Sequence, residues 1–179
     1  MVVAATLGVV GVLMGRTQVG RDLFDSVGDR AGGTVAVAAV SSFDPQGNDG
    51  VENQDQLGAL TDDDPATTWS TVRYNSRDLG GLKDGVGVVL ELGGVHQLTS
   101  LDVASPSRGW AASVYVAEQP AGNLQGWGPP VATQSGIEGS ASFALDGARG
   151  GAVLVWITDL GDGSVGPRFS TALGSAELS

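Results

Sequence analysis

The sequence predicts an all-β protein, a jelly-roll β-sandwich of about eight strands. From residue 34 onward, short runs rich in Val, Leu, Ile and Thr recur along the chain, and clusters of Gly, Pro, Asn and Asp separate them. Two of these runs alternate apolar and other residues with the period of a half-buried strand. No amphipathic helix of any length is visible after residue 34.

The expected strands follow one another at the spacing of a sandwich. The clearest alternation places Val86, Val88, Leu90 and Leu92 on one face, and the run 98–104 alternates similarly with one break of phase that indicates a bulge. Trp69 and Trp156 lie inside apolar runs, so we expect both in the core. The expected strands are residues 34–40, 68–74, 86–92, 98–104, 113–117, 141–145, 152–158 and 169–178.

The first 33 residues differ from the rest of the chain. Residues 1–15 are apolar and uncharged, and Arg16 ends the run. The run is shorter than the roughly 20 residues that cross a bilayer, and it lacks the basic start and cleavage site of a signal peptide. We interpret it as the outer end of a single transmembrane helix, with a buried helix or strand as the alternative. Residues 16–33 are then a charged spacer, and residues 34–179 form a domain on the extracytoplasmic side of the cell membrane.

Charge and composition exclude several classes of function. The chain has 20 acidic and 9 basic residues, a formal net charge of −11, which disfavours nucleic acid and anionic lipid surfaces as partners. Cysteine is absent, and His96, expected in a surface turn, is the single histidine, so thiolate sites and devices that need two imidazoles are excluded. The sequence has no nucleophile elbow, phosphate loop or dinucleotide fingerprint. We therefore expect no enzymatic activity.

The most informative motif is an acidic loop that ends in a tryptophan. Residues 62–69 read Asp-Asp-Asp-Pro-Ala-Thr-Thr-Trp, and carboxylates this close repel one another unless a cation or water neutralises them. The motif resembles the Asp-Gly-Asp-Pro-x-Thr-x-Trp signature of the galactose-binding-like jelly rolls, which include discoidin or coagulation-factor type C domains and related carbohydrate-binding modules. Asp63 stands where the signature has Gly; that Gly serves a turn with positive φ, which Asp tolerates better than most residues.

Further segments resemble a narrower group. This group is the extracytoplasmic C-terminal domain of actinobacterial membrane proteins that carry a kinase or pseudokinase domain, in some cases joined to a lipid II flippase-like membrane region. The resemblance covers residues 34–179 and implies a membrane-anchored domain. The segments that carry it are residues 43–45 with the acidic loop after them, 80–93 and 153–158.

The resemblance also implies a structural calcium ion beneath the acidic loop. Its ligands would be Asp62, Asp64, Thr67 and Glu177, together with backbone carbonyls. Calcium takes about six to eight oxygen ligands of this kind, and the ion would staple the loop without a catalytic part. The alternative is an Asp-capped turn without an ion, in which Asp62 and Asp64 accept hydrogen bonds from nearby backbone N–H groups.

Six residues are candidates for ligand binding. Arginine and asparagine supply planar donors and tyrosine an aromatic wall, the chemistry of a polyol or anionic glycan site, and an exposed tryptophan in a loop stacks on a sugar face. The alternatives are a surface salt-bridged turn leading to Asp78 and tryptophans folded back over the edge of the sandwich. The candidates are Arg73, Tyr74, Asn75, Arg77, Trp110 and Trp127.

A second acidic loop, residues 44–56, does not have the spacing of an EF-hand. We expect a solvated, mobile loop, with the rim of a ligand face as the alternative. Its polar residues are Asp44, Asn48, Asp49, Glu52 and Asp55.

These features favour a non-catalytic binding or sensor module whose partner is a cell-envelope glycan or a peptidoglycan-related group. The alternative is a protein-interaction or structural domain that positions an envelope protein and binds no small ligand. A secreted hydrolase would need a converging pair of acids in a cleft. An exposed Trp110 or Trp127 beside Arg73 or Asn75 in a concavity would favour the glycan, whereas a flat apolar patch would favour the protein partner.

Overall fold

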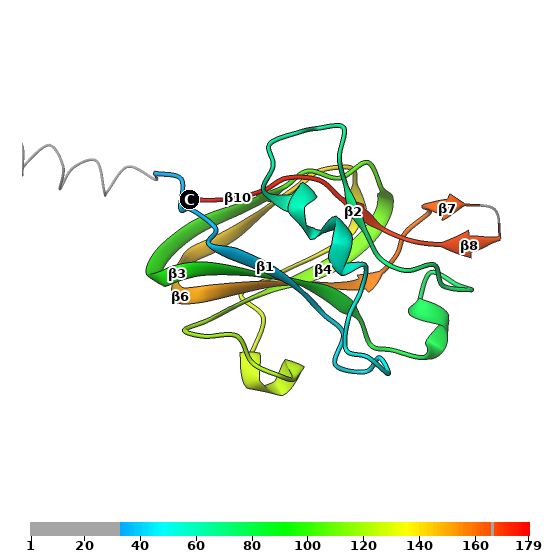
Figure 1. The fold of residues 1–179 in the computed structure, drawn as a ribbon, viewed down its shortest axis with the longest axis horizontal. Helices are drawn as coiled ribbons and strands as arrows, with labels where there is room; N and C mark the ends of the chain where they lie inside the picture. Colours follow the sequence, from blue (N-terminus) through cyan, green and yellow to red (C-terminus); the bar gives the residue numbers. More distant parts are fainter. Residues whose placement is uncertain (1–32, 166) are drawn as a thin grey trace, which may run out of the picture. The chain divides into compact units, whose positions relative to one another are not determined.

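A computed structural model describes residues 33–165 and 167–179 (Figure 1). The expected apolar segment, and the spacer up to residue 32, lie outside the described residues. No helix within the described ranges has the length and apolar character that a membrane span requires. Contacts group Val35–Ser179 into one compact unit.

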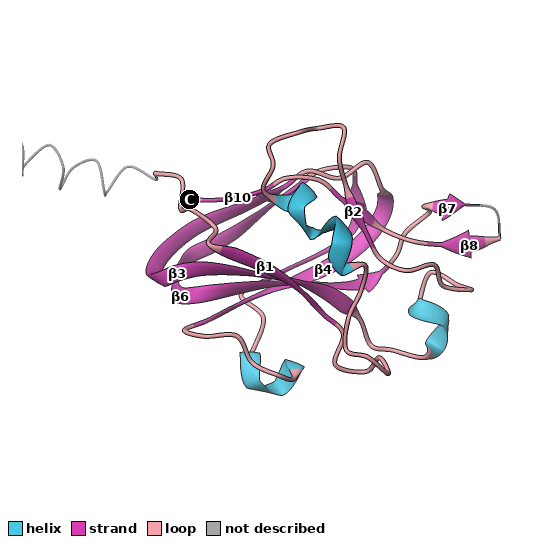
Figure 2. Cartoon of the chain, in the orientation of Figure 1, coloured by secondary structure: helices cyan, strands magenta, loops and turns pink. Residues whose placement is uncertain are grey.

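The described residues form ten strands and three short 3-10 helices (Figure 2). The strands are β1 Ala39–Phe43, β2 Trp69–Ser70, β3 Val86–Val103, β4 Arg108–Ala117, β5 Ala132–Glu138, β6 Ala141–Asp159, β7 Ser164–Val165, β8 Arg168–Phe169, β9 Ala172–Leu173 and β10 Ala176–Leu178. The helices are η1 Gln54–Leu60, η2 Leu79–Gly81 and η3 Leu124–Trp127.

Two long strands organise the sandwich. In the main antiparallel sheet the order is β1-β3-β6-β4-β5, and β10 pairs with the second half of β3. β3 and β6, of 18 and 19 residues, curve back on themselves along one side of the molecule (Figure 1). Their register shifts twice, between Glu91 and His96 and between Leu98 and Ser100, and bulges of this kind are what let a sheet bend.

The alternation in the sequence therefore marked the halves of longer strands. The expected strands 86–92 and 98–104 are both parts of β3, and 141–145 and 152–158 are both parts of β6. His96, expected in a turn, lies within β3 opposite Gly150. The expected break of phase in the run 98–104 is confirmed by the register shift after Leu98.

Apolar side chains pack on both faces of the main sheet. Between the layers, Val86, Val88, Leu90 and Leu92 face the large core together with Trp69, as expected. On the other face η3 and its flanking loop cover a second cluster, where Phe43 packs edge-to-face against Trp156 with ring centres 5.6 Å apart.

The three helices and the strands β5 and β7 were not expected from the sequence, and η1 and β5 show why. η1 begins at the end of the second acidic loop and buries only Leu57, Ala59 and Leu60, too few apolar positions to form a periodic pattern. β5 is an edge strand in which Ile137 alone is buried. Both depend on tertiary packing that a local pattern does not reveal.

A methyl group at Gly87 tests the pairing of β3 with β6. A Cβ at this position would lie 2.0 Å from the carbonyl oxygen of Val155, which belongs to the backbone and cannot rotate away. We expect Gly87→Ala to lower the free energy of unfolding by at least the ~1–3 kcal/mol typical of overpacking. Urea denaturation followed by tryptophan fluorescence measures this loss.

The matched control is Gly58→Ala, because a Cβ there meets nothing within 4 Å. It should change the free energy of unfolding by less than ~0.5 kcal/mol. Equal denaturation midpoints for the two variants would contradict the packing of β3 against β6.

Candidate functional site

Four polar side chains meet beneath the loops at one end of the sandwich. Asp44 follows β1, Glu52 precedes η1, Tyr74 follows β2 and Lys83 precedes β3. Asp44 and Glu52 are 3% and 1% exposed, and the side chain of Lys83 is 14% exposed. We call these four residues the buried network.

The buried network places one cation between two carboxylates. Lys83 Nζ lies 2.5 Å from Asp44 Oδ2 and 3.2 Å from Glu52 Oε1. It also donates to Tyr74 Oη at 2.9 Å, while the Tyr74 hydroxyl donates to Glu52 Oε1. Asp44 Oδ1 has no hydrogen-bond partner among the described residues. The network therefore carries an excess of negative charge in a buried place, which makes the single lysine indispensable to it.

Glu52 joins this network to three segments of the fold. Its N–H donates to Ser42 Oγ of β1 at 3.0 Å, and its carbonyl accepts from Trp69 Nε1 of β2 at 3.1 Å. Its Oε2 accepts from the backbone N–H of Val72 at 2.6 Å. The segment expected to be a solvated, mobile loop is thus tied down at Glu52, and that expectation was wrong for Asp44 and Glu52. The two carboxylates can be buried because Lys83, more than 30 residues further along the chain, contacts both of them.

The polar neighbours change the acidity of Lys83 and Tyr74. Burial alone would lower the pKa of the Lys83 ammonium, but its hydrogen bonds to Asp44, Tyr74 and Glu52 outweigh burial and raise this pKa above its ordinary value. Burial, followed by the hydrogen bond to Glu52, raises the pKa of the Tyr74 hydroxyl. Both groups therefore keep their protons in the folded protein at neutral pH.

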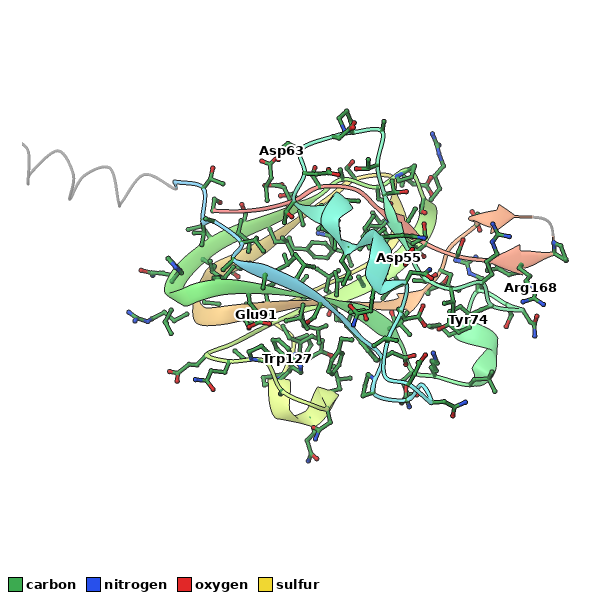
Figure 3. The ribbon with its side chains drawn as sticks, viewed as in Figure 1. Asp55, Asp63, Tyr74, Glu91, Trp127 and Arg168 are labelled. Atoms are coloured by element: carbon green, nitrogen blue, oxygen red, sulfur yellow. The ribbon has the colours of Figure 1, made fainter. Side chains whose placement is uncertain are left out.

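The candidate residues Arg73, Tyr74 and Asn75 lie where the chain pairs with β8. Tyr74 and Phe169 exchange two backbone hydrogen bonds of 2.9 Å. Tyr74 turns into the core and is 7% exposed, so it is no open aromatic wall, whereas Arg73 and Asn75 are exposed. Figure 3 shows Tyr74 and Arg168 toward the end of the molecule that carries β7 and β8.

Arg77 takes the alternative role of a salt-bridged turn. Its guanidinium contacts Asp159 at 2.8 Å and Asp162 at 3.2 Å, and it donates to the carbonyl of Gly109 at 2.9 Å. The partners are these two aspartates and not Asp78, because the turn folds back onto the end of β6. Arg77 therefore braces the loops and has few donors left for a ligand.

The two candidate tryptophans are buried, which corrects their assignment to a sugar-stacking site and agrees with the alternative of rings turned away from solvent. Trp110 is 0% exposed, belongs to the large core and donates from Nε1 to the carbonyl of Gly139 at 3.0 Å. Trp127 is 3% exposed and packs edge-to-face against Phe43 beneath the sheet (Figure 3). Trp110 lies in β4 and not in a loop, and η3 folds Trp127 inward, so neither ring offers a face to a sugar.

The loop at residues 62–69 forms an Asp-capped turn. Asp62 Oδ1 accepts from the N–H of Asp64 at 3.0 Å, Asp64 Oδ1 accepts from the N–H of Ala66 at 2.9 Å, and Thr67 Oγ1 donates to Asp62. Asp63 has a φ of 55°, which is the turn geometry expected for the position where the signature has Gly.

These hydrogen bonds bring three of the four expected calcium ligands together. Glu177 lies opposite Asp102 in the pairing of β10 with β3 and lines a shallow hollow with it. Within the described ranges no three Asp, Glu or His side chains gather closely enough to hold a metal. As the side chains lie here, the four residues do not form a closed set of ligands, and calcium stays a prediction.

Comparison with known proteins gives a likeness in structure only. No family model and no curated protein matches the chain. Among solved structures, the CBM32 of AlyQ in complex with 4,5-unsaturated mannuronic acid aligns with a TM-score of 0.57 and 13% identity, over 82% of this chain and 98% of that one. A chitosan-binding module in complex with chitotriose, from a Paenibacillus chitosanase/glucanase, aligns with a TM-score of 0.56 and 13% identity, over 80% and 97%.

A third similar structure is a CBM32 module from Clostridium perfringens, with a TM-score of 0.53 and 14% identity over 79% of this chain and 91% of that one. The fold is a galactose-binding-like jelly roll. The resemblance that residues 62–69 indicated is thereby confirmed at the level of the fold. A longer chain, truncated AlyQ with CBM32 and alginate lyase domains, also aligns, over 32% of its length.

Replacing Lys83 tests how much the buried network contributes to the free energy of unfolding. Lys83→Met would leave the carboxylates of Asp44 and Glu52 buried without a cation, so we expect a loss of ~3–5 kcal/mol in the free energy of unfolding. The control is Arg108→Gln, which breaks an ion pair with Glu138 of 3.8 Å whose side chains are 76% and 64% exposed. That pair should contribute at most ~1 kcal/mol. Similar losses in the two variants, measured by urea denaturation, would show that the network is not a main support.

The same network predicts a loss of stability in alkali. The folded pKa values of Lys83 and Tyr74 lie above their ordinary values of 10.5 and 10.0, so above about pH 10 the folded state binds more protons than the unfolded state. Their contribution is complete at neutral pH, and the free energy of unfolding falls as the pH rises from about 10.

Urea denaturation of the wild type and of Tyr74→Phe between about pH 8 and about pH 11 measures this effect. The decline should be shallower in Tyr74→Phe, because the phenylalanine ring has no proton to lose. Parallel curves for the two proteins would refute the assignment.

Proposed function

We propose that the domain is a non-catalytic binding module that recognises a glycan of the cell envelope, with peptidoglycan-related saccharides as the ligand class. The jelly-roll fold supports this proposal, since the similar structures include modules in complex with a uronic acid derivative and with chitotriose. We further propose that residues 1–15 anchor the module in the cell membrane with the domain on the extracytoplasmic side. Calcium, held by Asp62, Asp64, Thr67 and Glu177, would serve only to fix the loop.

One observation carries the choice of site. Arg73 and Asn75 are exposed, and neither side chain forms a hydrogen bond or an ion pair within the described residues. The residue between them, Tyr74, is held by two backbone hydrogen bonds and by Glu52. Free planar donors on a fixed backbone suit a saccharide, because ordering the loop costs little when the ligand binds.

A protein partner is the second candidate. Two apolar side chains near the same loops are open to solvent, Leu82 with 77% and Val72 with 39% of its surface exposed. Contiguous exposed apolar surface marks protein interfaces, whereas single exposed apolar side chains are ordinary. Two exposed apolar side chains are weak support for a protein interface, so the exposed polar side chains of Arg73 and Asn75 favour the saccharide.

Titration of the full chain tests the proposal. Soluble peptidoglycan fragments and chito-oligosaccharides, with calcium present, should produce saturable heat changes in calorimetry. We expect the double variant Arg73→Ala, Asn75→Ala to weaken saccharide binding by about tenfold or more, because two donors are lost and one of them is charged.

Arg149→Ala is the matched control, since this arginine lies in β6 and pairs with Gln97 in the sheet, away from the loops of the site. It should leave the affinity unchanged. Flat titrations with every saccharide would reject the glycan and favour the protein partner, and an unchanged affinity in the double variant would reject the site.

A further inference from the structure

The segment between β2 and Tyr74 contains a bulge that the register reveals. Ser70 lies opposite Ala172, and Tyr74 lies opposite Phe169. Four steps on one strand therefore match three steps on the other, so one residue is extra between Thr71 and Arg73. A bulge of this kind turns a side chain away from its regular direction and frequently lies beside a functional site.

Glu52 stabilises this bulge. The N–H of Val72 does not pair with the neighbouring strand and instead donates to Glu52 Oε2 at 2.6 Å. The carboxylate that accepts it is buried and is held in turn by Lys83 and Tyr74. The extra residue is thus accommodated without an unpaired N–H, and Arg73 is presented to solvent from a backbone with little freedom.

The bridge between Tyr74 and Phe169 places Arg73 diagonally across from a second arginine. With Tyr74 opposite Phe169, the residues before each of them, Arg73 and Arg168, occupy diagonal positions across the pair. Diagonal residues of an antiparallel pair are about 7–8 Å apart, within reach of long side chains. Both arginines are exposed, and Phe169, like Tyr74, packs against the core. The two guanidinium groups therefore share the outward face.

Within the part of the chain that the structure describes, neither arginine forms an ion pair, although the whole chain has a net charge of −11. Within the described residues, Arg77, Lys83 and Arg108 form ion pairs, whereas Arg73, Arg149 and Arg168 form none. Arg149 lies in β6, so the bridge between Tyr74 and Phe169 brings two of the three unpaired cations together. Two like charges held side by side repel each other, and an anion between them removes the repulsion.

We propose that Arg73 and Arg168 together bind a carboxylate of the saccharide, so that the module selects acidic sugars over neutral ones. This inference rests on the proposed function, and it adds Arg168 and the charge of the ligand to it. A guanidinium offers two parallel N–H donors that match a carboxylate. Asn75, exposed beside them, supplies neutral donors and acceptors for the hydroxyl groups.

The test compares two saccharides that differ in one carboxylate. A disaccharide of N-acetylglucosamine and N-acetylmuramic acid is titrated into the full chain beside N,N′-diacetylchitobiose (chitobiose below), which lacks the lactyl group and its carboxylate. At low salt we expect the acidic disaccharide to bind about tenfold more tightly. The preference should shrink when the salt concentration rises toward physiological values, because exposed charges are screened. Acetate alone, at the same concentrations, distinguishes a saccharide carboxylate from a free one.

Variants assign the preference to the two arginines. Arg168→Gln should lower the affinity for the acidic disaccharide by about tenfold and change that for chitobiose by less than about twofold. Arg73→Gln should weaken both, since Arg73 also contributes to neutral binding, and Arg149→Gln should change neither. Equal affinities for the two saccharides, an Arg168→Gln variant that keeps the preference, or acetate that binds as tightly as the disaccharide would overturn this inference alone. Absence of binding to both saccharides would instead reject the proposed function.

Discussion

The buried carboxylate of Glu52 is the constraint on which the loop end of this jelly roll depends. An ionised side chain that is 1% exposed is tolerated only where cations and hydrogen-bond donors replace the lost water. Glu52 finds them in Lys83, in the Tyr74 hydroxyl and in the N–H of Val72. Val72 and Tyr74 belong to the segment after β2 and Lys83 to the segment before β3, so one carboxylate fixes the relative positions of two loop segments.

This arrangement links the interior of the protein to its surface. The same hydrogen bond that satisfies Glu52 also stabilises the bulge before Tyr74 and turns Arg73 outward. Asp44 reinforces the link, because its Oδ2 accepts a hydrogen bond from the same Lys83 ammonium that donates to Glu52. The loop that would hold a ligand is therefore arranged before a ligand arrives, and little conformational entropy remains to be lost on binding.

The sequence predicted the parts of the fold that rest on local patterns. The alternation from Val86 to Leu92 marked the inner face of β3, and the motif at residues 62–69 indicated the jelly roll. The buried network could not be seen, because Lys83 stands 39 positions from Asp44 and 31 from Glu52, and nothing local links them. The assignment of Trp127 to a sugar-stacking site was wrong for a related reason. Gly and Pro around Trp127 suggest an exposed loop, but burial of its ring depends on Phe43 from a distant strand.

Burial of the aromatic residues limits the contacts by which the surface around Arg73 and Arg168 could bind a saccharide. All four tryptophans of the chain are buried, and so are both tyrosines, so none of these six rings is open for stacking on a sugar face. Affinity must come from directed polar contacts, which are weak in water unless one partner is charged. In the proposed site, Arg73 and Arg168, which form no ion pair within the described residues, would meet this need. The negative charge of the surrounding surface repels polyanions in general. An acidic saccharide would therefore bind only where its carboxylate and hydroxyl groups match Arg73, Arg168 and the amide of Asn75.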